Sequence, residues 1–449
     1  MSLYMTDVLL IFVLLFFVIL KIKTKNYELR IKNYEFGFWL FIAIIDVAIL
    51  VSIFFAPSKL LAVYSYFRFL LGVGLFWLIV SAKYDKVKLT WSLIAGAAIQ
   101  AGLGIWQFLS QSSFAFKWLG IAEHKPFDLG TSVVEVMGYD GIWERWLRAY
   151  GGLDHPNMLG GMLAIILLLL VAMFINLKTT MSLRAQRSNL SEPALPRLLR
   201  PSDLKSEGLA MTIILFTSYF LLLTSLFFTF SRGAWAGFVT GLISLLIILL
   251  WKKEEKKMNG ALELIFAGFI IVLFLFNLYG NLVLTRLSKD TRLEIKSNTE
   301  RLESYKYAKE IIKNHWLFGV GIGNYTLAIY NESNTNKSPY TPFNKGGNQP
   351  SYFYQPVHNT FLLVWAEIGI LGLLGYLGLM LYVICYAIKW AGGKDSLKAL
   401  NISILIALTV MMLVDHWYWS LHFGVMFLWL ILGLIIKMQN VNIKNQNVN

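Results

Sequence analysis

Four short polar patterns stand out in a chain of 449 residues that is otherwise strongly apolar. They are RAYGGLDHPN from Arg148, SRGAW from Ser231, FGVGIGNY from Phe318 and HNTFLLVWAE from His358. An arginine guanidinium is a planar fork of hydrogen-bond donors that fits phosphate oxygens, and a histidine can accept a proton near neutral pH. Together these residue types are suited to binding a phosphate-bearing ligand and to transferring a proton.

Arg232 lies in a turn between two apolar runs, and this turn has very few polar residues. Its guanidinium is therefore held near the level of lipid headgroups. A fixed fork of donors at that level matches a diphosphate. The alternative is an arginine that only extends its charged end toward water. Further along, Arg286, Arg292 and Arg301 suit an anionic headgroup or a lipid diphosphate, or are ordinary solvated charges.

The pattern from Phe318 is a weak nucleotide-binding motif, because no strand precedes its glycines, and a tight turn returning the chain to the membrane fits it better. In the fourth pattern Glu367 follows His358 by nine residues, which is about 13 Å and about half a turn of net rotation along a helix. A catalytic pair of these two is therefore not expected, and Glu367 faces a neighbouring helix or is protonated. His358 by itself also fits a helix-capping or interfacial histidine.

No metal site is expected from the spacing of the histidine and acidic residues on the same side. None of them follows H-E-x-x-H or another ligand pattern, and the chain has no G-x-S-x-G elbow for serine hydrolase chemistry. The residues considered are His155, His358, His416 and His422, with Asp154 and Asp415.

Hydrophobic residues make up 57% of the chain and charged residues only 15%. One soluble domain could not bury that much apolar surface, and the apolar residues instead form runs of about twenty, the length of a membrane-spanning helix. The composition excludes a soluble enzyme, a disordered chain and, with Cys385 as the single cysteine, a disulfide-stapled module. The formal charge of +14 is assigned to loops beside a membrane, so no nucleic-acid partner is expected.

The sequence therefore predicts an all-α fold, a polytopic transmembrane helical bundle of about 11–12 spans with a large, partly helical periplasmic loop. About eleven candidate spans lie near residues 4–20, 36–55, 60–81, 89–109, 156–176, 209–229, 233–251, 261–280, 359–388, 399–414 and 421–437. Basic residues cluster in loops on one side of this count, and the positive-inside rule makes those loops cytoplasmic. The N-terminus is then outside and the C-terminal tail inside, whereas twelve spans with the N-terminus inside would need one further span.

These spans divide the chain into five segments. They are 1–110 with the N-terminal spans, 111–155 as a first outer loop, 156–280 with the central spans and a basic cytoplasmic loop at 178–208, 281–358 as a large periplasmic loop, and 359–449 with the C-terminal spans and a cytoplasmic tail. Loop 178–208 shows no sustained period and is expected to be irregular. Between Leu302 and Trp316 the apolar residues share one helical face and Gly319 ends the pattern, which predicts an amphipathic helix along the outer leaflet.

Taken together, these motifs resemble one family, the superfamily of O-antigen ligases and O-antigen polymerases. The similarity covers roughly residues 145–390. It rests on RAYGGLDHPNMLGG, FSRGAWAGF, an R-x-x-x-Y spacing that begins at Arg301 and precedes LFGVGIGNY, and HNTFLLVWAEIGILGLLGYL, in that order. The closing DHWYWSLHFGVMFLWLILGL also resembles the end of such proteins. The basic insert at 178–208 and a count of eleven rather than twelve spans depart from the family pattern.

The resemblance implies glycosyl transfer at the outer face of the bacterial plasma (inner) membrane, with the active site facing the periplasm. Members of this family pass a glycan from undecaprenyl diphosphate to an acceptor hydroxyl without a metal or another cofactor. By motif position, Arg232 and His358 correspond to catalytic residues, and Arg148 and Arg301 join Arg232 as contacts to the lipid diphosphate. Cationic side chains can neutralise a diphosphate leaving group in place of Mg²⁺, and a histidine supplies a base of near-neutral pKa.

The partners implied by the resemblance are an undecaprenyl-diphosphate-linked glycan donor, a lipid A–core or other glycan acceptor, and membrane lipids. A ligase, a surface-polysaccharide polymerase and a protein O-glycosylating enzyme all remain open, because these motifs do not specify the acceptor. A transporter of glycan-linked lipids is the alternative from another class, and it needs polar residues along a path at mid-membrane depth. The spans offer only scattered ones, chiefly Asp46, Arg68, Gln100 and Glu367, and the gathering of polar motifs at one interface favours an enzyme.

Overall fold

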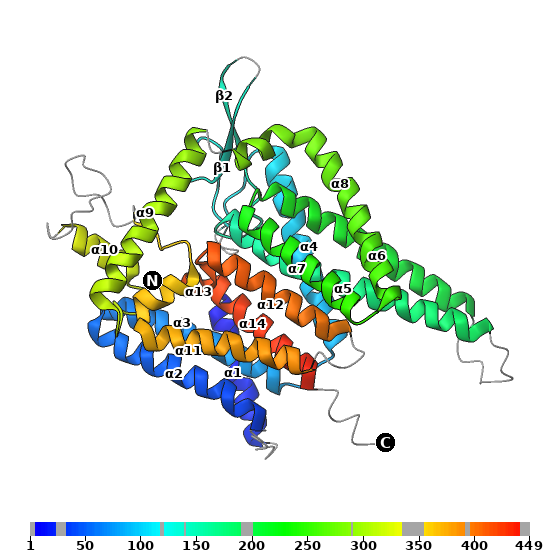
Figure 1. Ribbon diagram of the computed structural model, residues 1–449, viewed down its shortest axis with the longest axis horizontal. Coiled ribbons are helices and arrows are strands. Elements are labelled where there is room, and N and C mark those ends of the chain that lie inside the picture. The colour runs from blue at the N-terminus through cyan, green and yellow to red at the C-terminus, as the bar shows by residue number, and fades with distance from the viewer. Residues whose placement is uncertain are drawn as a thin grey trace. The chain divides into compact units, whose positions relative to one another are not determined.

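The computed structural model describes residues 5–23, 33–116, 121–138, 141–189, 201–288, 291–334, 354–390 and 396–440. Helices dominate these residues, and the two strands form one small sheet (Figure 1). The helices are α1 (Met5–Lys23), α2 (Asn33–Phe55), α3 (Lys59–Ser81), α4 (Lys86–Ser110), α5 (Pro156–Asn189), α6 (Pro201–Phe228), α7 (Arg232–Trp251), α8 (Glu255–Leu287), α9 (Arg292–His315), α10 (Tyr325–Asn334), α11 (Thr360–Trp390), α12 (Ser396–Val414), α13 (Trp417–Ser420) and α14 (His422–Asn440). The strands are β1 (Val133–Met137) and β2 (Trp143–Leu147).

Two compact units make up the chain, and each combines stretches that are distant in the sequence. Unit 1 comprises residues 1–83, 296–392 and 412–449, and it holds α1–α3, α10, α11, α13, α14 and most of α9. Unit 2 comprises residues 84–295 and 393–411, and it holds α4–α8, both strands, the first turn of α9 and most of α12. Helix α9 therefore belongs to both units.

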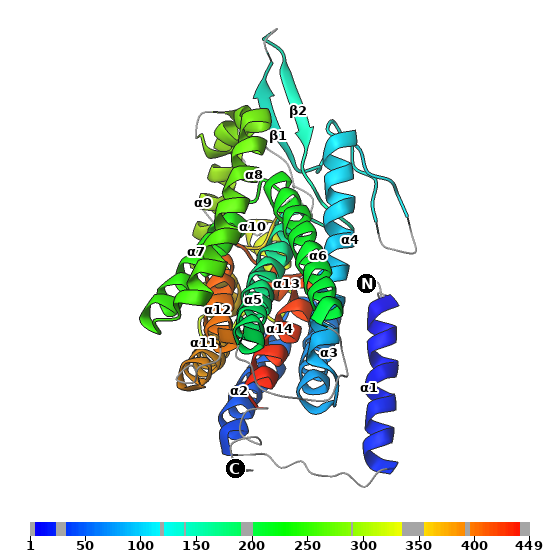
Figure 2. The same ribbon diagram turned by 90° about the vertical axis from the view of Figure 1, so that its right-hand side faces the viewer.

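Helix α5 is the central helix of unit 2. It packs against α4, α6, α7 and α8, and 94% of its most apolar stretch within Pro156–Ser182 is buried. An unbroken run of apolar residues and glycine over residues 158–175 makes this helix apolar all round, which suits a helix with neighbours on every side. Pro156 begins α5, at a position where its missing amide donor is no loss. Figure 2 shows α4, α5, α6 and α7 side by side.

A β-hairpin, which the sequence analysis did not predict, lies between α4 and α5. Strand β1 pairs antiparallel with β2, so that Val133 lies opposite Leu147 and Met137 opposite Trp143. The signal was present, because VVEVM and WERWL are short β-forming runs on either side of a segment that contains two glycines. It was overlooked because the segment lies between two much stronger membrane-span signals.

In unit 1, α2 packs along α11 and α3 packs along α14, and α1 contacts α3. Helix α1 exposes most of its apolar side chains but buries one acid, Asp7, which is 2% exposed. The Asp7 carboxylate lies 3.2 Å from Nε2 of His422 on α14. This polar contact joins an otherwise apolar helix to the rest of the unit. Figure 1 shows α2 and α11 running alongside each other.

Helix α11 is interrupted at Gly369, whose backbone has φ 71° and ψ −175°. The glycine-rich segment after α9 fills the interruption: the amide of Val320 donates to the carbonyl of Ala366 at 2.9 Å, and the amide of Ile370 donates to the carbonyl of Trp316 at 2.9 Å. The segment from Phe318 is therefore bound backbone to backbone to a broken membrane helix. Such close approach needs a residue without a side chain, because a Cβ on Gly369 would lie 2.0 Å from the Leu317 carbonyl oxygen.

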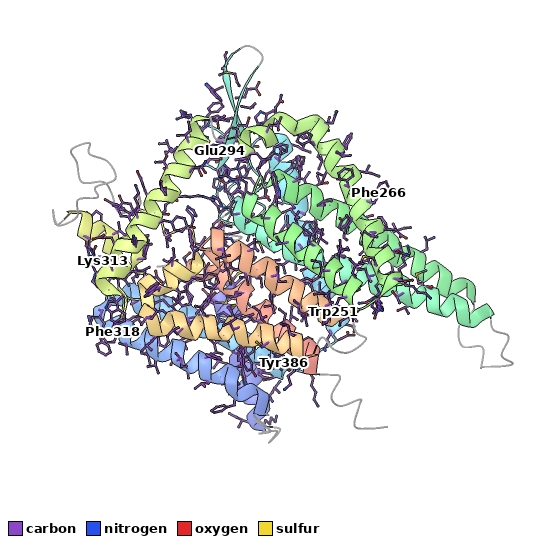
Figure 3. The ribbon with its side chains drawn as sticks, viewed as in Figure 1. Trp251, Phe266, Glu294, Lys313, Phe318 and Tyr386 are labelled. Carbon is purple, nitrogen blue, oxygen red and sulfur yellow. The ribbon has the colours of Figure 1, made fainter. Side chains whose placement is uncertain are left out.

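The membrane spans agree with the sequence prediction. Nine described helices are long and apolar enough to cross a membrane, and two shorter apolar helices, Ala399–Val414 and His422–Lys437, bring the number to the eleven expected. Apolar side chains remain on the outside of the spans, as at Trp251 on α7 and Phe266 on α8, which are 81% and 66% exposed (Figure 3). Such surfaces suit lipid rather than water. The chain is a multi-pass helical membrane protein.

The prediction that residues 178–208 form an irregular loop is wrong for those of them that the structure describes. Helix α5 continues to Asn189 and α6 already begins at Pro201, while residues 190–200 lie outside the described part of the chain. Arginine, lysine, glutamine and leucine have good helix propensity, so a helix that has crossed the membrane can continue through them without an apolar face. The absence of hydrophobic periodicity was mistaken for the absence of a helix.

The amphipathic helix of the large loop is confirmed as α9, and Gly319, with φ 71°, follows its last turn as predicted. Its buried face is covered by protein: Ala308, Ile311 and Ile312 pack with core residues of α10 and α11. The prediction that this face lies on the outer leaflet is wrong for these three side chains. The amphipathic pattern was correct, but a hydrophobic face does not specify whether lipid or protein covers it.

Replacement of Gly369 by alanine should destabilise unit 1. The new Cβ would collide with a carbonyl group, and the positive φ is strained for any residue with a side chain. We expect a loss of more than about 2 kcal/mol, measured as a lower thermal unfolding midpoint of the purified protein in detergent. Gly102→Ala in α4 is the matched control, because a Cβ there meets nothing within 4 Å, and it should be neutral or slightly stabilising. Equal unfolding midpoints for Gly369→Ala and the wild type would contradict this reading of the break.

Candidate active site

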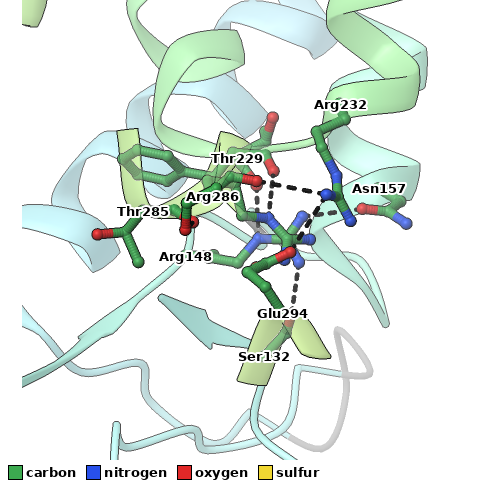
Figure 4. Close-up of polar contacts among 10 residues, drawn as sticks. Ser132, Arg148, Asn157, Thr229, Arg232, Thr285, Arg286 and Glu294 are labelled. Carbon is green, nitrogen blue, oxygen red and sulfur yellow. Dashed lines mark hydrogen bonds and ion pairs between the residues drawn. The ribbon is translucent and has the colours of Figure 1, made fainter. Parts of the chain in front are cut away.

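Arg148 is buried, at 3% exposure, and three uncharged acceptors hold its guanidinium. Nε donates to the Thr229 carbonyl at 2.7 Å, Nη1 to the Ser132 hydroxyl at 2.6 Å and Nη2 to Asn157 Oδ1 at 2.8 Å (Figure 4). Arg148 and Asn157 are the two ends of the first sequence motif, so that motif closes on itself. The residue before β1, the α6–α7 turn and the start of α5 thus all converge on one charged side chain.

The backbone that follows Arg148 is fixed by two glutamines on α4. Gln107 accepts from the amide of Gly151 at 2.8 Å and donates to the carbonyl of the same residue at 2.7 Å. Gln100, two turns earlier, accepts from the amide of Gly152 at 2.6 Å. Polar side chains of a membrane span are used here to position the loop that carries the arginine.

Arg232 is the first residue of α7, and Ser231 caps that helix by accepting a hydrogen bond from the amide of Ala234. The Arg232 side chain reaches the start of α9, where Nη1 lies 3.2 Å from Glu294 Oε2. The same nitrogen donates to the backbone carbonyl of Arg286 at 3.4 Å. The Arg232 side chain is 26% exposed, so it is the most accessible part of this group.

Arg286, near the end of α8, completes the arginine cluster, defined here as Arg148, Arg232 and Arg286. Its Nε donates to the Phe230 carbonyl at 3.1 Å, and its Nη1 bonds Oε1 of Glu294 (Figure 4). The Arg286 side chain is 10% exposed. One buried carboxylate therefore bridges two of the three arginines.

A kink in α8 brings Arg286 into this cluster. The helix departs from helical geometry at Tyr279, with φ −127° and ψ 22°. The Tyr279 ring packs edge-on against Phe108 and Phe228, with ring centroids 5.1 Å and 5.4 Å apart. The kink lies at the end of the predicted span 261–280, and the turns beyond it carry Arg286 as helix rather than as loop.

The arginine cluster has more positive charge than its surroundings neutralise. Glu294 contacts Arg232 and Arg286, whereas Arg148 is bonded by uncharged acceptors, so these three guanidinium groups and one carboxylate carry a formal excess of two positive charges. Burial lowers the pKa of Arg148, and the charge of Arg286 lowers it further. An anion bound beside the guanidinium group would oppose both effects. A ligand with two negative charges would balance the excess charge.

His358, Asp415 and His416 gather in unit 1, where one side-chain nitrogen or oxygen from each lies within 4.8 Å of the others. The two imidazole rings are 5.3 Å apart, and Nδ1 of His416 lies 2.6 Å from the Ser420 hydroxyl. In this histidine cluster His358 precedes α11, and Asp415 and His416 follow α12. Sequence spacing could not reveal the cluster, because two helices separate its members along the chain. Two imidazoles and a carboxylate could hold a cation, but the positive charge of Arg301 acts on both histidines and opposes one.

The pKa of His358 is lowered to about 4, mainly by burial. His416 and Arg301 lower it further, whereas the negative charge of Asp415 raises it. His358 is therefore neutral at pH 7, and its Nδ1 is buried without a hydrogen-bond partner among the described residues. A neutral nitrogen of this kind is available to accept a proton. The near-neutral pKa expected from the sequence is corrected downward, because the ring is buried beside other positive or partly positive groups.

Glu367 brings the third and fourth sequence motifs together in unit 1. Its buried carboxylate accepts from Nε1 of Trp419 at 2.8 Å and from the backbone amides of Gly323 and Tyr325. These partners agree with the expectation that Glu367 faces a neighbouring element. A cavity of about 220 Å³ lies beside this carboxylate, and Ser420, the partner of His416, also lines it.

The family model described as O-antigen ligase matches residues 217–377 of the chain. The segment 217–377 is similar to the O-antigen ligase family. No curated protein matches the chain. The resemblance to the O-antigen ligase and polymerase superfamily, expected from the four motifs, is thereby confirmed for this segment.

The O-antigen ligase segment 217–377 includes Arg232, Arg301 and His358, whereas Arg148 precedes it. The structure brings Arg148 and Arg232 together in unit 2, and it places Arg301 near His358 in unit 1. The sequence analysis named Arg286 only as one of several basic residues suited to headgroups, and it did not single out Glu294. Their roles depend on the kink in α8 and on the α8–α9 turn, and neither has a clear sequence signal.

We expect the stability of the protein to fall as the pH is lowered from 7 to 4. In this window the unfolded chain binds a proton at His358, near pH 6.5, while the folded protein does not bind one until about pH 4. The loss attributable to His358 should be of the order of 2 kcal/mol at the acid end, measured by thermal unfolding in detergent across the pH range.

His358→Gln is the matching variant, because glutamine keeps a polar amide and does not titrate. It should lose less stability than the wild type between pH 7 and pH 4. Identical pH dependence in the two proteins would show that His358 is not held neutral by its surroundings.

Proposed function

We propose that this protein transfers a glycan from undecaprenyl diphosphate to an acceptor hydroxyl at the outer face of the bacterial inner membrane. The acceptor is lipid A–core or another glycan, as in an O-antigen ligase, and the site faces the periplasm. Arg148 and Arg232 bind the diphosphate, and His358 acts on the acceptor hydroxyl. No metal or other cofactor takes part in the proposed reaction.

The observation that carries this proposal is the excess positive charge of the arginine cluster. A diphosphate that is esterified at both ends has two negative charges, one on each phosphate, and this equals the excess in the cluster. Arg148 is fixed by three uncharged acceptors, so its geometry exists before a ligand arrives and its charge remains uncompensated. Fixed donors of this kind stabilise charge that develops on a leaving group.

In the proposed reaction the acceptor oxygen attacks the anomeric carbon and the bond from that carbon to the diphosphate oxygen breaks. The electron pair of the broken bond stays on the diphosphate, where the arginines stabilise it. The proton of the acceptor hydroxyl passes to the unprotonated ring nitrogen of His358, which is neutral at pH 7. The proposal thus assigns the leaving group to the arginines and the nucleophile to the histidine.

In the proposed reaction Arg301 contacts the substrate near His358 and His416. Its charge acts on both His358 and His416, so an anionic part of a substrate near these rings would be attracted to it. The cavity beside Glu367 offers room for a substrate group close to the same residues. Aromatic and polar side chains share its lining, among them Tyr376, Trp419 and Arg68, which suits a sugar.

No observation favours the transport alternative. The polar residues of the spans are engaged in specific contacts: Asp46 accepts from the Tyr66 hydroxyl at 2.8 Å, Gln100 holds the backbone of Gly152, and Glu367 binds Trp419. Side chains used in this way support local structure.

Arg232→Ala should reduce transfer by at least about a hundredfold while the protein stays folded, because one fixed charge-assisted donor to the leaving group is lost. Arg232→Lys should restore little, since a point charge does not reproduce the guanidinium fork. Transfer is measured with purified full-length protein, an undecaprenyl-diphosphate-linked oligosaccharide and lipid A–core. Arg292→Ala removes an arginine of the same unit whose side chain is 72% exposed, and it should leave transfer near the wild-type level. Near-wild-type turnover by Arg232→Ala would end the diphosphate assignment.

His358→Ala should abolish transfer and leave binding of the lipid-linked donor intact, because the histidine acts on the acceptor. Donor binding is followed with the same purified protein in the absence of acceptor. EDTA added to the wild-type assay should have no effect, since the proposal routes no step through a metal. Inhibition by EDTA that added Zn²⁺ or Mg²⁺ reverses would instead make His358, Asp415 and His416 a metal site.

A further inference from the structure

Glu294 occupies an unusual position for an acidic residue in a site that binds anions. It is 2% exposed, in the first turn of α9, and its two carboxylate oxygens face two different arginines. Oε1 bonds Nη1 of Arg286, and Oε2 lies 3.2 Å from Nη1 of Arg232 (Figure 4). A carboxylate between two guanidinium groups has the charge and the acceptor geometry of a phosphate.

The two contacts of Glu294 differ in quality. Oε1 accepts a hydrogen bond from Arg286, whereas Oε2 accepts none from any described residue, although it lies at ion-pair distance from Arg232. A buried carboxylate oxygen without a hydrogen bond is under-satisfied. Arg232 is also the more exposed of the two arginines, with a side-chain exposure of 26% against 10%. The contact between Arg232 and Glu294 is therefore the one that a ligand can exchange at least cost.

We propose that Glu294 is a built-in counter-anion of the arginine cluster: it holds the position on Arg232 that one phosphate of the substrate takes, and it makes the site selective for diphosphates. This inference rests on the proposed function, because it concerns the same site. A diphosphate meets three arginines and can replace the Glu294 contact on Arg232 while its second phosphate is bound by the remaining donors. A single phosphate would gain a contact with Arg232 only by breaking the contact between Arg232 and Glu294. The two changes offset each other, so a single phosphate binds weakly.

The charge of the site supports this selectivity. With Glu294 ionised the cluster has an excess of two positive charges, which a diphosphate diester matches and a monophosphate diester does not. Without Glu294 the excess would be three, and the cluster would attract anions more strongly and less selectively. Glu294 is thus a specificity-determining residue, and it contacts the arginines in the absence of substrate.

The test is the binding of inorganic diphosphate and of inorganic phosphate to the purified full-length protein, measured by calorimetry for the wild type and for Glu294→Gln. Glutamine keeps the shape and removes the charge, so diphosphate affinity should rise at least about tenfold. Phosphate affinity should rise by a larger factor, so that the preference for diphosphate narrows. If Glu294 only aligned the arginines, the change in affinity would have the opposite sign. Glu294→Gln would then bind both anions more weakly than the wild type.

Glu135→Gln is the matched control. Glu135 is a buried carboxylate of the same unit, 4% exposed, which pairs with Arg145 and Arg292 outside the cluster. Its replacement should leave both affinities unchanged. If Glu135→Gln raises diphosphate affinity as much as Glu294→Gln does, the effect is one of overall charge and the proposal is wrong.

A measurement on the wild type does not depend on the folding of a variant. Displacement of Glu294 by inorganic diphosphate should loosen the first turn of α9, so amide hydrogen exchange in residues 292–298 should become faster on binding. Slower exchange there would contradict the proposal. If the wild type binds no diphosphate and Arg232→Ala makes no difference, the proposed function fails, whereas diphosphate binding that Glu294→Gln does not strengthen overturns only the role of Glu294.

Discussion

A guanidinium group that is buried in a membrane protein must have its hydrogen bonds satisfied and its charge balanced, and Arg148 meets the first requirement but not the second. Its three protein acceptors are uncharged, and they come from the residue before β1, the α6–α7 turn and the start of α5. Much of unit 2 can be understood as the framework for this side chain. Gln100 and Gln107 fix the backbone beside it, and the kink at Tyr279 adds Arg286. The unbalanced charge is what makes the site a receptor for an anion.

The chemistry of the transfer is divided between two groups of residues with opposite electrostatic demands. The leaving group needs positive charge held in place, and the nucleophile needs a neutral base. In unit 2 one carboxylate contacts two of the three arginines, and in unit 1 burial lowers the pKa of His358 and of His416. Helix α9 begins with Glu294 in the first group and continues to Arg301 beside the second.

Much of the fold was predictable because the strongest signals are local. Runs of about twenty apolar residues indicate the spans, Pro156 marks the start of α5, and Gly319 marks the end of α9. The hairpin, the helical ends of the segment 178–208 and the protein cover of α9 were not predicted. Each depends on what packs against the segment, and polar or short elements have weak periodicity.

The site was predictable only in part for the same reason. Arg148, Arg232 and His358 stand in motifs with recognisable types and spacing, so the sequence indicated them. Arg286 and Glu294 have no such context, and their pairing arises from the turn between α8 and α9. The gathering of His358 with Asp415 and His416 needs the return of the chain through α12. Contacts between distant segments are not written in the spacing of either one.

The central claim is that the uncompensated charge of the arginine cluster binds a lipid diphosphate. It is tested most directly by comparing the binding of undecaprenyl diphosphate and undecaprenyl monophosphate to the wild-type protein in detergent micelles at low and high salt. The account predicts that the diphosphate binds at least about tenfold more tightly and that the preference persists at high salt, because buried charges are screened little. Equal affinity for the two lipids, or a preference that disappears with salt, would contradict it.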